Sequence, residues 1–132
     1  MAKVVATLKA ASPDVPVTVF TKGGGIWLQD LASIGADCVG VDWTVNLGKA
    51  RALVGDKVAL QGNVDPFILM GSASEITRQT HAAMASFGAA QGNQAGHVFN
   101  LGHGINQFTP PESVTALSEA VISKSKALRA KQ

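Results

Sequence analysis

Short runs of β-branched and aliphatic residues alternate along this chain with longer segments of helical periodicity. The apolar runs cover residues 17–21, 38–41, 58–60 and 97–101. Their apolar positions are near-continuous rather than alternating with polar ones, which is typical of strands buried on both faces of a parallel sheet. Four short strands are therefore expected, each followed by a helical segment.

Three helical segments are expected before residue 55. Two of them end at glycines, and the one at the N-terminus continues a helix that begins upstream. Residues 26–34 and 47–54 are predicted helices closed by Gly35 and Gly55, because glycine commonly ends a helix in the left-handed conformation. Residues 1–11 are amphipathic, and no capping residue precedes them, so we expect the end of a preceding helix. Its shared apolar positions are Val4, Val5 and Leu8.

The last two helices begin with capping-box patterns. Ser-Ala-Ser-Glu at residues 72–75 predicts the start of the third helix, which is expected to end at Gly88. In the fourth, Thr109 is expected to cap, Pro110 to occupy the first helical position and Glu112 to complete the box. The apolar positions expected to be buried on these helices are Ile76, Ala83, Met84, Phe87, Val114, Leu117, Val121 and Leu128.

The order of these elements predicts the fold class. One helix is followed by four strand–helix units, and no linker or low-complexity segment divides residues 1–132, so a single segment is expected. Strict alternation of buried strands and helices predicts an α/β fold with a parallel sheet and right-handed crossovers. Residues 88–96 are expected to form only a loose loop, and Asp65-Pro66 predicts one extra short turn. The pattern does not distinguish an open doubly wound sheet from part of a barrel.

Composition narrows the class of protein. With 132 residues, 46% of them hydrophobic, the chain is long enough to bury a core. Only 15% are charged, which indicates that part of the surface meets protein rather than water. The single cysteine, Cys38, excludes an internal disulfide and is typical of a cytoplasmic protein. No apolar run approaches the roughly 20 residues that span a membrane, so no membrane contact is expected.

The only cluster of cations lies near the C-terminus. It comprises Lys124, Lys126, Arg129 and Lys131. These residues fall in the last turns of the fourth predicted helix, where cations suit the helix macrodipole. No aromatic residue lies among them for base stacking, which favours the structural interpretation over nucleic-acid binding.

Candidate chemistry gathers after the predicted strands, the ligand-binding end of parallel α/β folds. The segments that follow the four strands begin with Lys22 and Gly23–Gly25, with Asp42, with Gln61 and the nearby Asn63, and with Gly102-His103-Gly104. His103 is flanked by glycines and has no helical stripe to join, so contact with a ligand is the favoured role. No cluster of histidines, cysteines and carboxylates has metal-ligand spacing, and no Ser-His-Asp or Cys-His pair can be assembled.

The other rim residues have competing interpretations. For Asp42, hydrogen bonds to the backbone of neighbouring loops are favoured over direct catalysis, and Asn63 is similar. Asp65 is most simply a helix cap. The glycines at residues 23–25 match neither the dinucleotide fingerprint nor the P-loop, so a tight turn is favoured over a phosphate cradle.

Two motifs, taken together with their spacing, resemble uroporphyrinogen decarboxylase. The first is Gly-Val-Asp-Trp-Thr at residues 40–44, followed by Lys-Ala-Arg at 49–51 and Val-Ala-Leu-Gln-Gly-Asn-Val-Asp-Pro at 58–66. The second is Phe-Asn-Leu-Gly-His-Gly-Ile at residues 99–105, followed by a Thr-Pro-Pro-Glu-Ser-Val helix start. The resemblance covers essentially the whole chain.

This resemblance implies a fold and an activity. The family is a (β/α)₈ TIM barrel, of which these four parallel βα units would be the C-terminal half. It removes the carboxyl groups of the acetate side chains of uroporphyrinogen III, giving coproporphyrinogen III in haem biosynthesis, with no cofactor or metal. The resemblance assigns His103 to the active site, in contact with the carboxylate side chains of the porphyrinogen substrate, and it implies a homodimer.

The length of the chain limits what the resemblance implies. A complete barrel needs about 250 residues, and the family's essential aspartate and arginines match no position here. We therefore expect the isolated chain to be inactive and to form a homo-oligomer. Two alternatives stay open: a non-catalytic α/β ligand-binding or assembly module derived from that barrel, and a nucleotide-binding half-Rossmann unit. The absence of a cysteine after Cys38 argues against the zinc-dependent methyl-transfer relatives.

Overall fold

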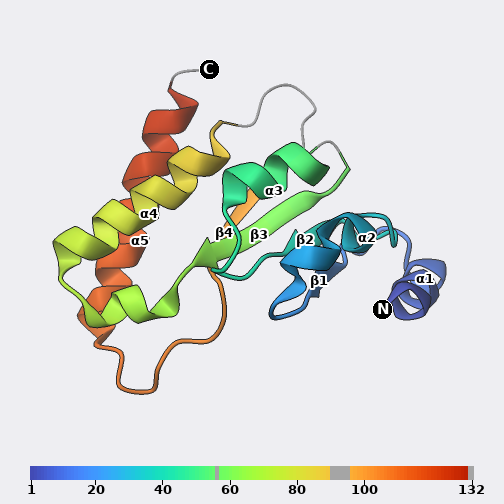
Figure 1. The fold of residues 1–132 in the computed structure, drawn as a ribbon, viewed down its shortest axis with the longest axis horizontal. Helices are drawn as coiled ribbons and strands as arrows, with labels where there is room; N and C mark the ends of the chain where they lie inside the picture. The colour runs from blue at the N-terminus through green and yellow to red at the C-terminus, as the bar shows by residue number, and fades with distance from the viewer. Residues whose placement is uncertain (56, 90–95, 131–132) are drawn as a thin grey trace.

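The computed structural model describes residues 1–55, 57–89 and 96–130. Within them, four strands form one parallel sheet in the order β1-β2-β3-β4 (Figure 1). The strands are β1 (Thr18–Phe20), β2 (Cys38–Gly40), β3 (Ala59–Val64) and β4 (His97–Leu101). The predicted parallel sheet and its sequential order are confirmed. β3 continues past residue 60, the expected end, because it pairs with β4 as far as Val64 and Leu101.

Helices alternate with the strands, as the hydrophobic pattern predicts. They are α1 (Ala2–Ala11), η1 (Gly24–Trp27), α2 (Leu28–Ala32), α3 (Leu47–Val54), η2 (Pro66–Met70), α4 (Ala73–Phe87) and α5 (Pro111–Arg129). Each α-helix from α2 onward packs against the next along the chain. Figure 1 shows α1 and α2 at one end of the molecule and α4 and α5 at the other.

The core lies between the helices and the sheet. Its larger cluster joins Val5 of α1 to Val19, Val39 and Leu60, which are buried residues of β1, β2 and β3. A second cluster joins Leu69 of η2, Ile76 of α4 and Leu117 of α5, against Phe99 and Leu101 of β4. Every strand therefore sends alternate side chains toward the helical layer.

The other face of the sheet is open at both edges. β2 is buried throughout, but the side chains at both ends of β1 are exposed, and so are Val98 and Asn100 of β4. The expectation that all four strands are buried on both faces was wrong for β1 and β4. Phe20, at the end of β1, is 46% exposed because no helix in the described part of the chain covers this face.

Two helix ends differ from the expected glycine caps. α2 ends at Ala32, and Gly35, with φ 85°, lies in the turn beyond it. Gly55 has φ −61°, so it is not a left-handed cap. A Cβ on Gly55 would overlap the carbonyl oxygen of Arg51, so close packing explains the glycine at this position.

The start of α5 is shifted by one residue. Pro110 is extended and occupies the cap position, because the following Pro111 disfavours helical geometry in the residue before it. Thr109 makes no side-chain hydrogen bond, so its expected capping role was wrong. Leu117 is buried as predicted, but Val114 is 38% exposed, and Ser113 and Ala120 are buried beside Leu117 instead.

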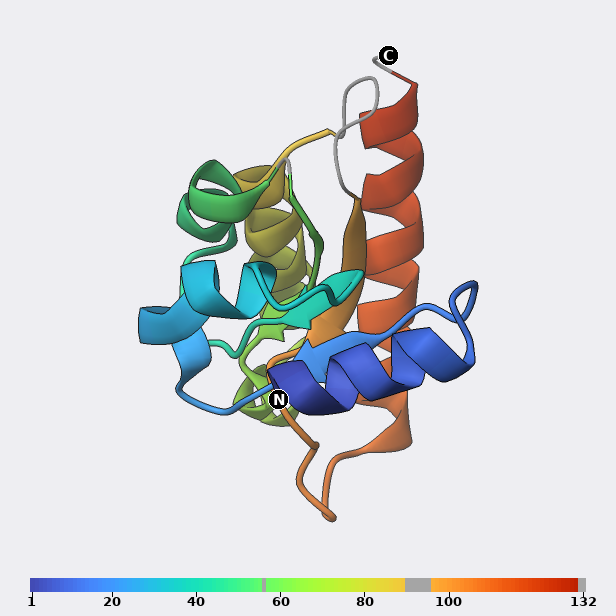
Figure 2. The ribbon, with the colours of Figure 1, turned by 90° about the vertical axis from the view of Figure 1, so that its right-hand side faces the viewer.

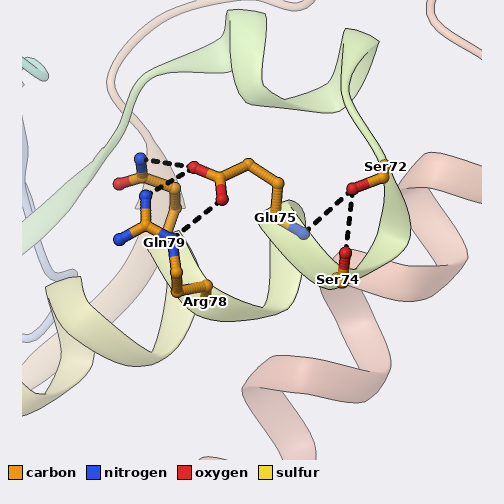
Figure 3. A network of polar contacts seen from close by, with 5 residues as sticks. All are labelled: Ser72, Ser74, Glu75, Arg78 and Gln79. Carbon is orange, nitrogen blue, oxygen red and sulfur yellow. Dashed lines mark hydrogen bonds and ion pairs between the residues drawn. The ribbon is translucent and has the colours of Figure 1, made fainter.

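α4 begins with half of the expected capping box (Figure 3). The Ser72 hydroxyl accepts a hydrogen bond from the backbone N–H of Glu75 at 3.3 Å. The Glu75 carboxylate, instead of returning to Ser72, accepts hydrogen bonds from Arg78 and Gln79 on the same helix. These bonds, with Arg78 contributing most, lower the pKa of Glu75 to about 2.

The N-terminal segment is helical, as predicted, but buries one apolar residue. Val5 is 2% exposed, whereas Val4 and Leu8 are 62% and 49% exposed. Lys9 forms an ion pair of 2.6 Å with Asp37, which precedes β2. Most of the predicted loop at residues 88–96 and the terminal Lys131 lie outside the described residues.

Candidate functional site

The C-terminal ends of the four parallel strands share one rim of the sheet. Lys22 follows β1, Asp42 follows β2 and His103 follows β4, so the three residues lie at the same end, as predicted. The loop from β4 to α5, which carries His103, projects from this end of the molecule at the bottom of Figures 1 and 2. The rim therefore brings together polar side chains that lie up to 81 positions apart in the sequence, from Lys22 to His103.

A cleft of about 440 Å³ opens beside His103 on the uncovered face of the sheet. Its lining comprises Phe20, Gly40, Val41, Gln61, Asn100, Leu101, Gly102, His103, Gly104 and Ile105. These residues come from all four strands and from the segments after β2 and β4. No Asp, Glu, Lys or Arg belongs to this described lining, so His103 is its one titratable side chain.

The His103 ring is held in one orientation by its own loop. Its Nδ1 lies 2.9 Å from the carbonyl oxygen of Gly104. Because a carbonyl can only accept, Nδ1 carries the hydrogen, and Nε2 is left to bind a ligand. The ring is half-buried in the wall of the cleft. This arrangement suits contact with a polar group of a ligand.

Asp42 is buried under the rim, and its carboxylate accepts hydrogen bonds from backbone N–H groups. Its Oδ2 accepts a hydrogen bond from the N–H of Gly23, and its Oδ1 accepts from both the N–H and the hydroxyl of Thr44. Burial, the largest influence, raises the pKa of this carboxyl, but the bonds from Thr44 and Gly23 with the nearby His103 outweigh it and lower the pKa. Asp42 therefore makes the backbone contacts expected of a structural role.

Asn63 has a similar role and does not line the His103 cleft. Its Nδ2 donates to the carbonyl oxygens of Asp42 and Val45. It borders a second cavity of about 500 Å³, between the loop after β2 and α4, with Gln79 and Ser86. The preceding Gly62 has φ 140°, and a Cβ there would overlap the carbonyl oxygen of Val41. Only glycine therefore fits before Asn63.

His97 of β4 contacts the Gly62–Asn63 segment of β3 on the side of the sheet that faces the helices. Its Nε2 lies 2.7 Å from the carbonyl oxygen of Gly62, and its ring stacks on Phe87 with 4.7 Å between ring centroids. Burial lowers the pKa of His97 more than the Gly62 bond raises it. The neutral imidazole thus donates to the carbonyl of the peptide that precedes Asn63, which is a structural role.

The remaining rim residues divide into packing positions and solvent-facing positions. Gly102 is buried, and a Cβ there would overlap the backbone nitrogen of Trp43. Gly104 has open space around its Cα, and Lys22 is exposed. Gly23 has φ 71° and gives its N–H to Asp42, which favours the tight turn over the phosphate cradle.

Phe20 and Asn100 line the cleft but were not predicted as site residues, although Asn100 lies within the second motif. Gln61 was placed at the rim with the segment that follows the third strand, but no role was assigned to it. The usable signal is their phase: Asn100 and Val98 alternate with the more buried residues of β4. This alternation carries no information about a site if both faces of each strand are assumed to be buried.

The described part of the chain holds neither a metal cluster nor a membrane span. Among residues 1–55, 57–89 and 96–130, no group of three or more histidines, cysteines and carboxylates is placed to hold a metal ion. In the same ranges, no helix is long and apolar enough to span a membrane. Cys38 is buried, and burial raises the pKa of its thiol.

Comparison with known proteins identifies the family. Residues 1–123 match the family model described as uroporphyrinogen decarboxylase (URO-D). The chain is 59% identical over 117 residues to the uroporphyrinogen decarboxylase of Herminiimonas arsenicoxydans, a match that covers 88% of this chain and 32% of the relative. The enzyme of that name from Cupriavidus metallidurans is 53% identical over 134 residues, covering 100% of this chain and 36% of the relative. The chain therefore spans about a third of the length of these relatives.

A solved structure agrees with the fold. A methyltransferase from Methanosarcina mazei superimposes with a TM-score of 0.74, covering 93% of this chain and 35% of that chain, at 24% sequence identity. Four sequential parallel βα units with this likeness form a partial TIM-barrel-like fold. On the family match and on these identities, the chain belongs to the uroporphyrinogen decarboxylase family.

Proposed function

We propose that this chain acts as the C-terminal βα units of a uroporphyrinogen decarboxylase, converting uroporphyrinogen III to coproporphyrinogen III. The observation that carries the proposal is the cleft beside His103 at the strand ends, built from the Asn-Leu-Gly-His-Gly segment. The reaction is taken from the relatives of that name. Neither relative points to the alternative of a non-catalytic module.

The chemistry assigns a role to His103. Removing CO₂ from a pyrrole acetate leaves an electron pair on carbon, and a protonated pyrrole ring accepts that pair before a proton is delivered to the new methyl group. Catalysis requires a fixed anionic group beside the cationic ring and cationic or hydrogen-bonding groups around the other carboxylates. His103 Nε2 belongs to the second class: it orients a carboxylate side chain of the substrate.

The anionic group must come from outside the described residues. Asp42 is the buried carboxylate at this rim, but its oxygens accept hydrogen bonds from Gly23 and Thr44. A carboxylate that is already satisfied by three donors is poorly placed to stabilise a cationic ring. We therefore expect the isolated chain to be inactive.

The open sheet indicates what completes the site. β1 and β4 pair on one side only, and the face that carries the cleft is uncovered. We propose that the remaining βα units of a family barrel cover both edges and this face, since unpaired edges and open apolar faces are normally protected. The family resemblance also supports a homo-oligomeric, cytoplasmic enzyme that binds porphyrinogen and neither nucleic acid nor membrane.

A segment exchange tests this function. The 132-residue chain replaces the matching segment of the Cupriavidus metallidurans relative, and coproporphyrinogen formation is measured. We expect turnover, with His103→Ala lowering kcat/KM at least about tenfold, because a hydrogen bond to a charged group contributes about 1.5–3 kcal/mol. His81→Ala is the control, since His81 does not line the cleft. A folded hybrid without turnover, beside an active parent, would contradict the proposal.

A further inference from the structure

One row of side chains crosses the uncovered face of the sheet. Phe20 of β1 is in register with Gly40 of β2, Gly40 with Gln61 of β3, and Gln61 with Val98 of β4. Asn100 lies two residues beyond Val98 on β4, so it is on the same face and closer to the rim. Gln61 and Asn100 therefore flank the cleft from neighbouring strands, beside His103.

Neither of these amide side chains has a hydrogen-bonding partner among the described residues. Within residues 1–55, 57–89 and 96–130, the side chains of Gln61 and Asn100 make no hydrogen bond. Asn63 and Gln79 are different: their amides bind backbone carbonyls and the Glu75 carboxylate. Gln61 is partly buried, where polar side chains normally have partners, and Asn100 is exposed at the mouth of the same cleft. Both amides are therefore available to a ligand.

The same row supplies an apolar floor. Gly40 has no side chain, and a Cβ there would lie 2.8 Å from Cδ2 of Phe20, so the phenyl ring occupies the space over Gly40. Phe20 is 46% exposed and lines the cleft. A flat aromatic or pyrrolic ligand can pack on this phenyl ring while its polar substituents reach the amides and His103.

We propose that Gln61 and Asn100 form a neutral hydrogen-bonding subsite for a carboxylate side chain of the substrate, with Phe20 packing against the macrocycle. The proposal rests on the proposed function, because the ligand class is taken from it. A carboxylate is favoured because the described lining holds no acidic residue to repel it. The two NH₂ groups donate to the carboxylate oxygens, and His103 Nε2 binds a second polar substituent.

The test is a titration of the ¹⁵N-labelled segment-exchange hybrid, in which the remaining βα units prevent self-association over the cleft face, with uroporphyrin, the oxidised macrocycle with eight carboxylates. We expect the side-chain NH₂ resonances of Gln61 and Asn100 to shift together with the ring resonances of His103. The side-chain resonances of Gln79 should stay in place, because Gln79 lines the other cavity. Shifts confined to His103 would overturn the subsite and leave the proposed function standing.

Substitutions add a second, independent readout. Asn100→Asp and Gln61→Glu keep the shape but add a negative charge, and each should weaken the Kd for uroporphyrin about tenfold by like-charge repulsion. The matched control is Asn106→Asp in the loop after β4, where the new carboxylate still accepts the N–H of Phe108. Equal affinities for all three variants would overturn the subsite, as would uroporphyrin that leaves every cleft resonance unshifted. The segment-exchange assay then judges the proposed function separately.

Discussion

The side-chain Nδ2 of Asn63 donates a hydrogen bond to the backbone carbonyl oxygen of Asp42, with 2.9 Å between the two atoms. The Asp42 carboxylate in turn accepts hydrogen bonds from Gly23 and Thr44. Two buried side chains therefore connect the loops after β1 and β2 to β3, directly beneath the rim that carries His103. Loop positions at this rim are set by buried polar contacts as well as by packing.

Replacing Asn63 should destabilise the fold. Asn63→Ala removes both N–H donors: the Asp42 carbonyl keeps only the 3.4 Å bond from the Val45 N–H, and the part-buried Val45 carbonyl loses the Asn63 donor, at a cost of about 1–3 kcal/mol. The free energy of unfolding is measured by urea denaturation. Asn100→Ala, at an exposed position without a hydrogen bond, should stay within about 0.5 kcal/mol of the parent. Equal stabilities of the two variants would show that the Asn63 bonds contribute nothing.

Asp42 should make stability depend on acidic pH. Its pKa is lowered in the folded protein, so its contribution is complete above the unfolded value of about 3.9. That contribution should be lost as the pH falls from this value through the folded pKa. Asp42→Asn should make the free energy of unfolding less dependent on pH between about pH 5 and pH 2, which is roughly the range in which carboxylates titrate. Thr44→Ser keeps the hydroxyl donor and should retain more of the parent profile than Asp42→Asn does.

The two glycines beside His103 should respond differently to alanine. In Gly102→Ala the new methyl group meets the backbone of Trp43, and overpacking of this kind costs about 1–3 kcal/mol. In Gly104→Ala the methyl group enters open space, and stability should change by less than about 0.5 kcal/mol. Thermal unfolding of both variants is the measurement. A Gly102→Ala protein as stable as the parent would show that the β2 loop moves freely away from β4.

The isolated chain should self-associate. Phe20 and Val98, about half exposed on the uncovered face, are apolar surface that normally meets protein. Sedimentation at low micromolar concentration should show species heavier than the 13.6 kDa chain. Phe20→Ser with Val98→Thr should shift the distribution toward the monomer. A single 13.6 kDa species for the parent, without dye-accessible apolar surface, would mean that the segment needs no partner.

The purified chain should release no CO₂ from uroporphyrinogen above background. The cleft contains a histidine and amides, but Asp42 is occupied by Gly23 and Thr44, so no free carboxylate of the described part is available to the reacting pyrrole. Radiolabelled substrate provides the measurement. Turnover that disappears in His103→Ala would show that the reaction proceeds without a fixed anionic group beside the pyrrole ring.

Much of the fold and part of the site follow from local patterns. The apolar runs and the helix-start signals predict four parallel strands and their helices, because burial and capping depend on neighbouring residues in the chain. The rim position of His103, Asp42 and Lys22 follows from parallel pairing, which places all strand C-termini at one end. The family follows from two motifs at fixed spacing.

Other features depend on contacts between distant residues. Periodicity does not reveal that β1 and β4 are edges of the sheet, so it hides the exposed row from Phe20 to Val98 and the amides of Gln61 and Asn100. Thr109 loses its expected role because Pro111 displaces the cap by one residue, and Gly55 serves close packing rather than a left-handed turn. The Asn63 and Asp42 bonds likewise arise only when the loops after β1 and β2 meet strand β3, because their partners are separated in sequence by 21 and 19 positions and share no local pattern.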